Sequence, residues 1–162
     1  MFKTFIVAVV LVGASLASHA QISKEELAIV KGIFGMDKRE IVTTTIKMTP
    51  SDSLKFWPIF DQYEIDRKSL SLARIKLVHA FVSQYPDFTD DEINELMEGA
   101  IDLEANQLKL METYYHKFKK VAAAMVAGQW LQVESYINLA VKLAVQEKLP
   151  FIGDIKLKPL KK

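Results

Sequence analysis

Apolar residues recur every three to four positions along most of this chain, and the pattern is interrupted mainly at prolines. This period is typical of amphipathic α-helices and not of β-strands. Ser23, Thr49 and Thr89 each stand where a helix N-cap is expected, with an acidic residue three positions later. The pattern predicts an all-α fold with short helices over 24–33 and 37–48 and long helices over 50–84, 90–121 and 126–148.

Three segments weaken this helical pattern. The β-branched run over 41–46 lowers helix propensity, so an extended conformation is the alternative there. Pro58 lies inside the helix predicted over 50–84, where it removes one backbone hydrogen bond and should kink the first turns. The alanines over 122–124 form either a joint or a continuous helix.

The two long helices over 50–84 and 90–121 carry matching apolar positions. On both, the positions follow the four-three spacing found where paired helices meet in a seam. Folding the chain back at Asp87 brings the two sets together, from Phe56 against Phe118 to Phe81 against Ile93. The sequence therefore predicts a long antiparallel helical hairpin, packed with the third long helix and the short N-terminal helices. The predicted seam consists of Phe56, Phe60, Tyr63, Arg67, Leu70, Arg74, Leu77 and Phe81 on one helix and Ile93, Met97, Ala100, Glu104, Gln107, Met111, Tyr114 and Phe118 on the other.

The middle of this seam is polar, at Arg67, Arg74, Glu104 and Gln107. A buried arginine without a partner is strongly destabilising, so we expect Glu104 to pair with one or both arginines. Glu134 lies on the apolar face of the last helix and offers a second acid. We predict that these five residues form a structural network that fixes the register of three helices. The alternatives are a ligand site built on the same charges and arginines that extend to solvent.

Residues 1–20 read as a secretory signal peptide. A lysine at position 3 precedes an apolar run that is too short for a membrane span, and small residues precede Gln21. We therefore expect a periplasmic protein without a membrane span, with secretion as the alternative. The remainder divides into a single helical domain over 21–152 and a basic, flexible tail over 153–162 that contains four lysines.

Composition narrows the functions that the chain can have. It contains no cysteine, which excludes disulfides, thiol catalysis and cysteine-bound metals. Lys and Arg number 21 against 20 Asp and Glu, and loss of Lys3 with the signal peptide makes them equal. Such a chain has no net charge to attract nucleic acid.

Motifs that carry chemistry are missing from the sequence. It has no Gly-rich phosphate loop, no nucleophile elbow and no paired Glu-x-x-His motif. Glu112 and His116 lie four residues apart and form either a surface pair or a weak metal clip. We predict that the protein is not an enzyme and binds neither a cofactor nor a metal.

Aromatic residues exceed what the hairpin seam uses. Trp57, Tyr115, Trp130 and Tyr136 are candidates for a partner-binding surface. In the alternative interpretation, the first and last helices cover them.

The threonine caps are also the basis of a resemblance. The segments Met48-Thr49-Pro50-Ser51-Asp52 and Phe88-Thr89-Asp90-Asp91-Glu92 resemble the two Leu-Thr-x-x-Gln motifs of the Spy/CpxP-type periplasmic helical proteins. Both leading leucines and both terminal glutamines are replaced. The ordered set of Phe56-Trp57-Pro58, the capped helix at Thr89 and Gln132-Val133-Glu134 resembles a branch of small envelope relatives.

The resemblance implies a non-enzymatic periplasmic protein that suppresses aggregation without ATP or acts in envelope stress. The alternative is a structural module that docks on one specific envelope partner, and a metal- or small-ligand-binding bundle is a remote third. The partners expected are unfolded or envelope proteins, and a homodimer is compatible with the pattern.

Overall fold

The structure is a computed structural model that describes residues 28–153, and every regular element within this range is a helix. The predicted all-α fold is confirmed: two long antiparallel helical segments pack against a third long helix and short N-terminal helices. The elements are a helix over 28–34, α2 (Lys38–Thr45), α3 (Pro50–Asp66), α4 (Lys68–Gln84), α5 (Asp90–Val121) and α6 (Ala124–Gln146).

The helix starts follow local capping chemistry. The Thr49 hydroxyl accepts a hydrogen bond from the backbone N–H of Asp52 at 3.1 Å, and Thr89 forms a reciprocal capping box with Glu92. Asp37, which is not among the predicted caps, caps α2 with its side chain. Ser23, the segment over 1–20 and the tail beyond Gly153 lie outside the described residues.

The weak segments of the pattern take definite conformations. Residues 38–45 are helical despite their β-branched run, and Ala122 and Ala123 form a joint between α5 and α6. The helix predicted over 50–84 is interrupted at Arg67 and not at Pro58, which lies within α3. At Arg67 the backbone ψ is −12°, so the helix tightens locally before α4 continues.

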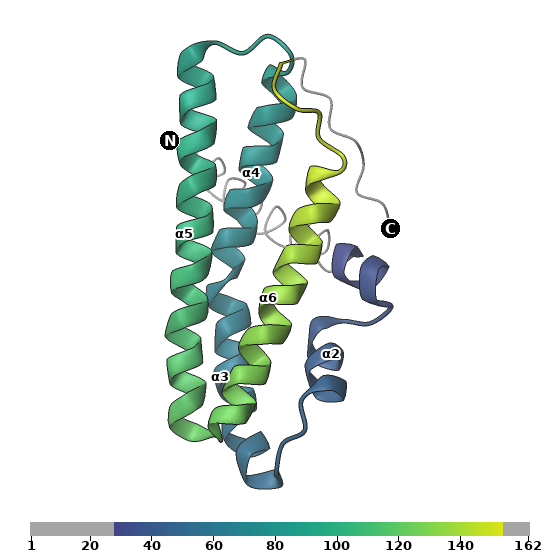
Figure 1. The fold of residues 1–162 in the computed structure, drawn as a ribbon, viewed down its shortest axis with the longest axis vertical. Coiled ribbons are helices and arrows are strands. Elements are labelled where there is room, and N and C mark those ends of the chain that lie inside the picture. Colours follow the sequence, from purple (N-terminus) through teal and green to yellow (C-terminus); the bar gives the residue numbers. More distant parts are fainter. Residues whose placement is uncertain (1–27, 154–162) are drawn as a thin grey trace, which may run out of the picture.

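Figure 1 shows α3 and α4 following one another alongside α5, while α6 ends well short of the turn between α4 and α5. We therefore distinguish two halves of the hairpin. The covered half is α3 with residues 107–121 of α5, onto which α2 and the first part of α6 pack. The open half is α4 with residues 90–106 of α5.

The covered half contains the main core. Phe56 and Phe118, a predicted seam pair, stack with ring centroids 4.4 Å apart, and Trp130 from α6 packs on Phe118 at 4.5 Å. Burial of several large aromatic side chains in one cluster dominates the packing energy of a domain of this size. The buried cluster consists of Val42, Ile46, Phe56, Phe60, Tyr63, Tyr114, Phe118, Val126, Ala127 and Trp130.

The open half has little buried surface. Ser71 is the one buried residue of α4, and Leu96 and Leu103 are the buried residues of α5 before Gln107. At the far end, Phe81, Tyr85 and Phe88 pack on one another around the turn.

The predicted seam is correct near Phe118 and wrong near Met97. Met97 is 41 % exposed, and Leu96 is buried in its place. A heptad frame assumes 3.5 residues per turn, whereas an α-helix has 3.6 and drifts by about 20° per heptad. Three heptads separate Phe118 from Met97, so the drift reaches about 60° and turns Met97 out of the seam. Leu77, its predicted partner, lies against Gly99.

Candidate binding surface

A cluster of charged and polar side chains connects α2, α3 and α6, and we call it the polar node. At its centre is Glu134, which is 1 % exposed. Its Oε1 accepts hydrogen bonds from the Lys38 Nζ at 2.6 Å, the Tyr63 hydroxyl at 2.5 Å and the Asn138 amide at 3.1 Å. The polar node consists of Lys38, Tyr63, Glu64, Arg67, Glu134 and Asn138.

The charges of the polar node balance. Lys38 also contacts Glu64 at 2.9 Å, and Glu64 in turn pairs with Arg67 at 2.8 Å, so two cations face two carboxylates. Burial alone would raise the pKa of Glu64, but the charges of Lys38 and Arg67 outweigh it and lower that pKa from 4.5 to about 2. Burial and the adjacent Glu134 carboxylate raise the pKa of the Tyr63 phenol, which therefore stays protonated as a donor.

The five residues predicted to form one network take part in different contacts in the structure. Glu134 is buried as its position on α6 suggested, and Gln107 donates a long hydrogen bond of 3.5 Å to the Tyr63 hydroxyl. Arg67 pairs with Glu64, its neighbour one turn earlier in α3.

Glu104 does not take the predicted role. It pairs with Lys142 of α6 at 2.9 Å, and both side chains are about half exposed. The predicted pair with Arg74 is therefore corrected. The physical reason is again the drift of α5, which turns Glu104 from the seam toward the side where α6 lies.

The cation that joins α2 to Glu134 is Lys38, which is not among the five residues of the predicted network. Its position immediately after the Asp37 cap, three residues before Ile41, places it on the buried face of α2. A lysine at that phase of an amphipathic helix was the available signal.

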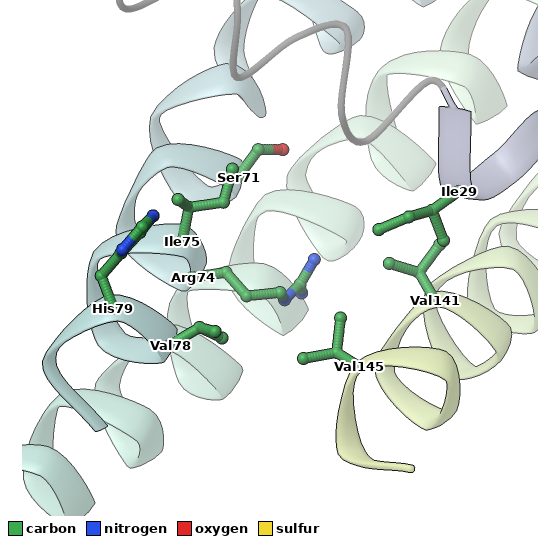
Figure 2. Close-up of a pocket in the computed structure, with 8 residues that line it drawn as sticks. All are labelled: Ile29, Ser71, Arg74, Ile75, Val78, His79, Val141 and Val145. Atoms are coloured by element: carbon green, nitrogen blue, oxygen red, sulfur yellow. The ribbon is translucent and has the colours of Figure 1, made fainter. Parts of the chain in front are cut away.

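An open groove lies between α4, α6 and the helix over 28–34. Arg74 is half-buried and extends across it among aliphatic side chains, while His79 points away (Figure 2). The groove has a volume of about 190 Å³, smaller than the 300–1,000 Å³ typical of ligand pockets. It has room for an apolar side chain or a short aliphatic group. Its lining residues are Ile29, Ser71, Arg74, Ile75, Val78, His79, Val141 and Val145.

Three of the four aromatic candidates for a partner surface belong to the core or its edge. Trp130 is fully buried, and Trp57 and Tyr115 pack against the same cluster. The Trp57 indole donates to the Ser53 hydroxyl at 3.0 Å, and the Arg39 guanidinium covers its ring. Tyr136 differs, because it is 64 % exposed and only its edge contacts Phe34.

The outer face of α5, along the open half and at Leu108 just beyond it, mixes apolar and acidic side chains. Ile101 and Leu108 are 61 % and 68 % exposed, and Met97 lies beside them one turn earlier. Between Asp90 and Leu108 the helix has no basic residue, while seven acidic ones occur at positions 90, 91, 92, 95, 98, 102 and 104. We call Met97, Ile101 and Leu108, with the acidic residues that flank them, the acidic α5 face. In the sequence this face is visible as a run of acidic residues interrupted by apolar ones. The heptad pattern had assigned Met97 to the seam and had not included Ile101 or Leu108.

Comparison with family models, with curated proteins and with solved structures found no match to this chain. Within residues 28–153 no three His, Cys, Asp or Glu side chains gather as metal ligands, and no helix has the length and hydrophobicity needed to cross a bilayer. The geometry of the described residues presents the polar node, the small groove and the acidic α5 face.

Proposed function

We propose that this protein is a non-enzymatic helical binding protein that holds apolar, basic segments of unfolded polypeptides and keeps them from aggregating without ATP. The observation that carries the proposal is the acidic α5 face. Ile101 and Leu108 leave apolar surface in water, and the acids beside them attract positively charged chains.

The positions of the aromatic residues favour this function over docking on one specific partner. A docking module needs a compact cluster of aromatic anchors, because such residues dominate the energy of specific interfaces. Here Trp57, Tyr115 and Trp130 are engaged in or against the core, and Tyr136 is the exposed one of the four. An apolar stripe flanked by like charges suits many weak contacts with varied chains.

The proposal also includes the periplasm as the compartment of the protein. The signal-like segment over 1–20 and the threonine-capped helix starts support a periplasmic protein of the Spy/CpxP type. In that compartment a protein that retains unfolded chains without ATP would act during envelope stress.

The experiment is an aggregation assay with two clients that share a fold but differ in charge. Reduced lysozyme is basic and reduced α-lactalbumin is acidic, so apolar binding alone would protect both. We expect strong suppression of lysozyme aggregation, weaker suppression for α-lactalbumin, and a loss of this preference as salt screens the acids. Absence of protection for both clients at several-fold excess would refute the proposal.

Variants test whether the suppression of aggregation depends on the acidic α5 face. Ile101→Ser with Leu108→Ser removes the apolar contacts, and Glu98→Gln with Asp102→Asn removes two of the flanking charges. We expect the first pair to abolish protection of both clients, and the second to lower protection of lysozyme alone. Leu54→Ser is the matched control, since Leu54 is exposed on α3, far along the hairpin from the acidic α5 face.

A further inference from the structure

Helix α6 is almost free of charge. Across Ala124–Gln146 the charged residues are Glu134 and Lys142. Glu134 is buried in the polar node, and Lys142 pairs with Glu104 of the same chain. A helix that is apolar or neutral on all sides is normally covered on all sides, yet one face of α6 is in solvent.

The exposed face has a regular pattern. The buried face of α6 contains Trp130, Ile137 and Val141, and the opposite face exposes large side chains. Tyr136 and Leu139 are 64 % and 63 % exposed. The positions on this face follow alternating steps of four and three, which is the heptad spacing that fits a second helix. They are Met125, Gln129, Gln132, Tyr136, Leu139 and Leu143, which we call the outer α6 seam.

We propose that the outer α6 seam binds the same seam of a second copy of this chain. Because the seam has no charge, it can face itself without repulsion, and the neutralised Lys142 beside it adds none. Gly128 and Ser135 stand next to the seam and let a second helix approach closely. Gln132 is exposed on the seam and its amide can donate to and accept from the second copy, whereas Gln129 is half-buried with its amide oxygen turned inward.

The size of the seam predicts a weak dimer. A helix of 23 residues is about 34 Å long and about 10 Å wide, so one pair of helices covers roughly 700 Å² in total. Stable dimers bury about 1,600 Å² or more. Association is therefore expected at micromolar to millimolar concentrations, and it leaves the acidic α5 face available on both copies.

Sedimentation equilibrium on the purified protein tests the proposal. Leu139→Glu buries a charge in an apolar contact, and we expect it to weaken association at least about tenfold. Leu54→Glu is the matched control, because Leu54 is also an exposed leucine but lies on α3, outside both the outer α6 seam and the acidic α5 face. A wild-type protein that stays monomeric at millimolar concentration, or a Leu139→Glu variant that associates as tightly as wild type, would overturn the proposal.

Leu139→Lys provides a second result, because a cation in the same apolar contact should weaken association as the anion does. A Leu139→Lys variant that associates as tightly as wild type would also contradict the proposal. Far-UV circular dichroism of each variant verifies the fold, and Leu139→Gln replaces any charged variant that does not fold. These measurements need no client. The dimer can therefore be refuted while the aggregation assay supports the proposed function, and the proposed function can be refuted while the dimer is supported.

Discussion

The two halves of the hairpin share a helix but differ in how their apolar residues are used. In the covered half, Phe118 and Tyr114 of α5 are buried against α3 and α6. In the open half, Met97 and Ile101 of the same helix are 41 % and 61 % exposed. Both stretches of α5 carry apolar residues at helical spacing, so the sequence period alone does not separate them.

What separates the halves is cover from a third layer. Helix α6 ends short of the hairpin turn, and α2 lies beside the covered half (Figure 1). Two helices side by side can bury only the stripe between them, whereas a third helix buries a second stripe on each. Stability therefore concentrates in the covered half, and the open half keeps apolar surface for binding.

The largest expected effect is truncation of the aromatic core. Trp130→Ala removes a fully buried side chain and should cost about 3–5 kcal/mol in the free energy of unfolding. Leu77→Ala in α4 should cost about 1 kcal/mol, because Leu77 is only half-buried and the site can relax. Urea denaturation of both variants measures the difference. Equal costs would mean that the open half is as tightly packed as the covered half.

The next effect concerns the polar node. Lys38→Met leaves the buried Glu134 without its cation and should cost about 3 kcal/mol or more. Arg39→Met is the matched control, since Arg39 pairs with Asp61 at the surface and should cost less than about 1 kcal/mol. Adding Glu134→Leu to Lys38→Met should recover much of the loss. No recovery in the double variant would contradict the role of Lys38 as the counter-ion.

A third effect depends on pH and again belongs to the covered half. The pKa of Glu64 is about 2 in the folded chain, below its ordinary value of 4.5, so the unfolded chain binds more protons between these values. The stabilisation by Glu64 is complete above about pH 4.5 and is lost as pH falls toward 2. It amounts to about 3 kcal/mol. Glu64→Gln should remove that slope from the stability measured between pH 2 and pH 5, and an unchanged slope would contradict this assignment.

The smallest effect compares two glycines. A Cβ on Gly99 would lie 2.8 Å from the Leu77 Cδ2, whereas nothing lies within 4 Å of a Cβ on Gly128. Gly128→Ala should stabilise the chain by up to about 1 kcal/mol through helix propensity. Gly99→Ala should be neutral within about 0.5 kcal/mol, because Leu77 can shift in the loosely packed open half. A loss above about 2 kcal/mol for Gly99→Ala would indicate rigid packing there.

Much of the fold could be predicted from the sequence because capping and helical period are local. Thr49 and Thr89 identified two helix starts, and the pairing of Phe56 with Phe118 followed from spacing alone. The heptad spacing used to pair the two long helices was wrong over longer distances. A straight helix drifts relative to that spacing, and the drift turned Met97 and Glu104 away from the seam.

The polar node could be predicted only in part. Glu134 could be predicted as a member, because an acidic residue on the apolar face of a helix needs a buried partner. Its partner Lys38 is 96 positions away on a short helix, and no pattern within α6 indicates which helix will cross it. The acidic α5 face was missed for a similar reason, since the helical period of α5 does not indicate which of its apolar positions a neighbouring helix covers.

The most direct test of the division between halves is hydrogen exchange of the purified protein, alone and with reduced lysozyme. We expect amides of α4 and of residues 90–106 to exchange much faster than those of α3 and residues 107–121, and we expect the client to slow exchange in residues 97–108. Uniform protection along α5, or slowing by the client confined to the covered half, would contradict the account.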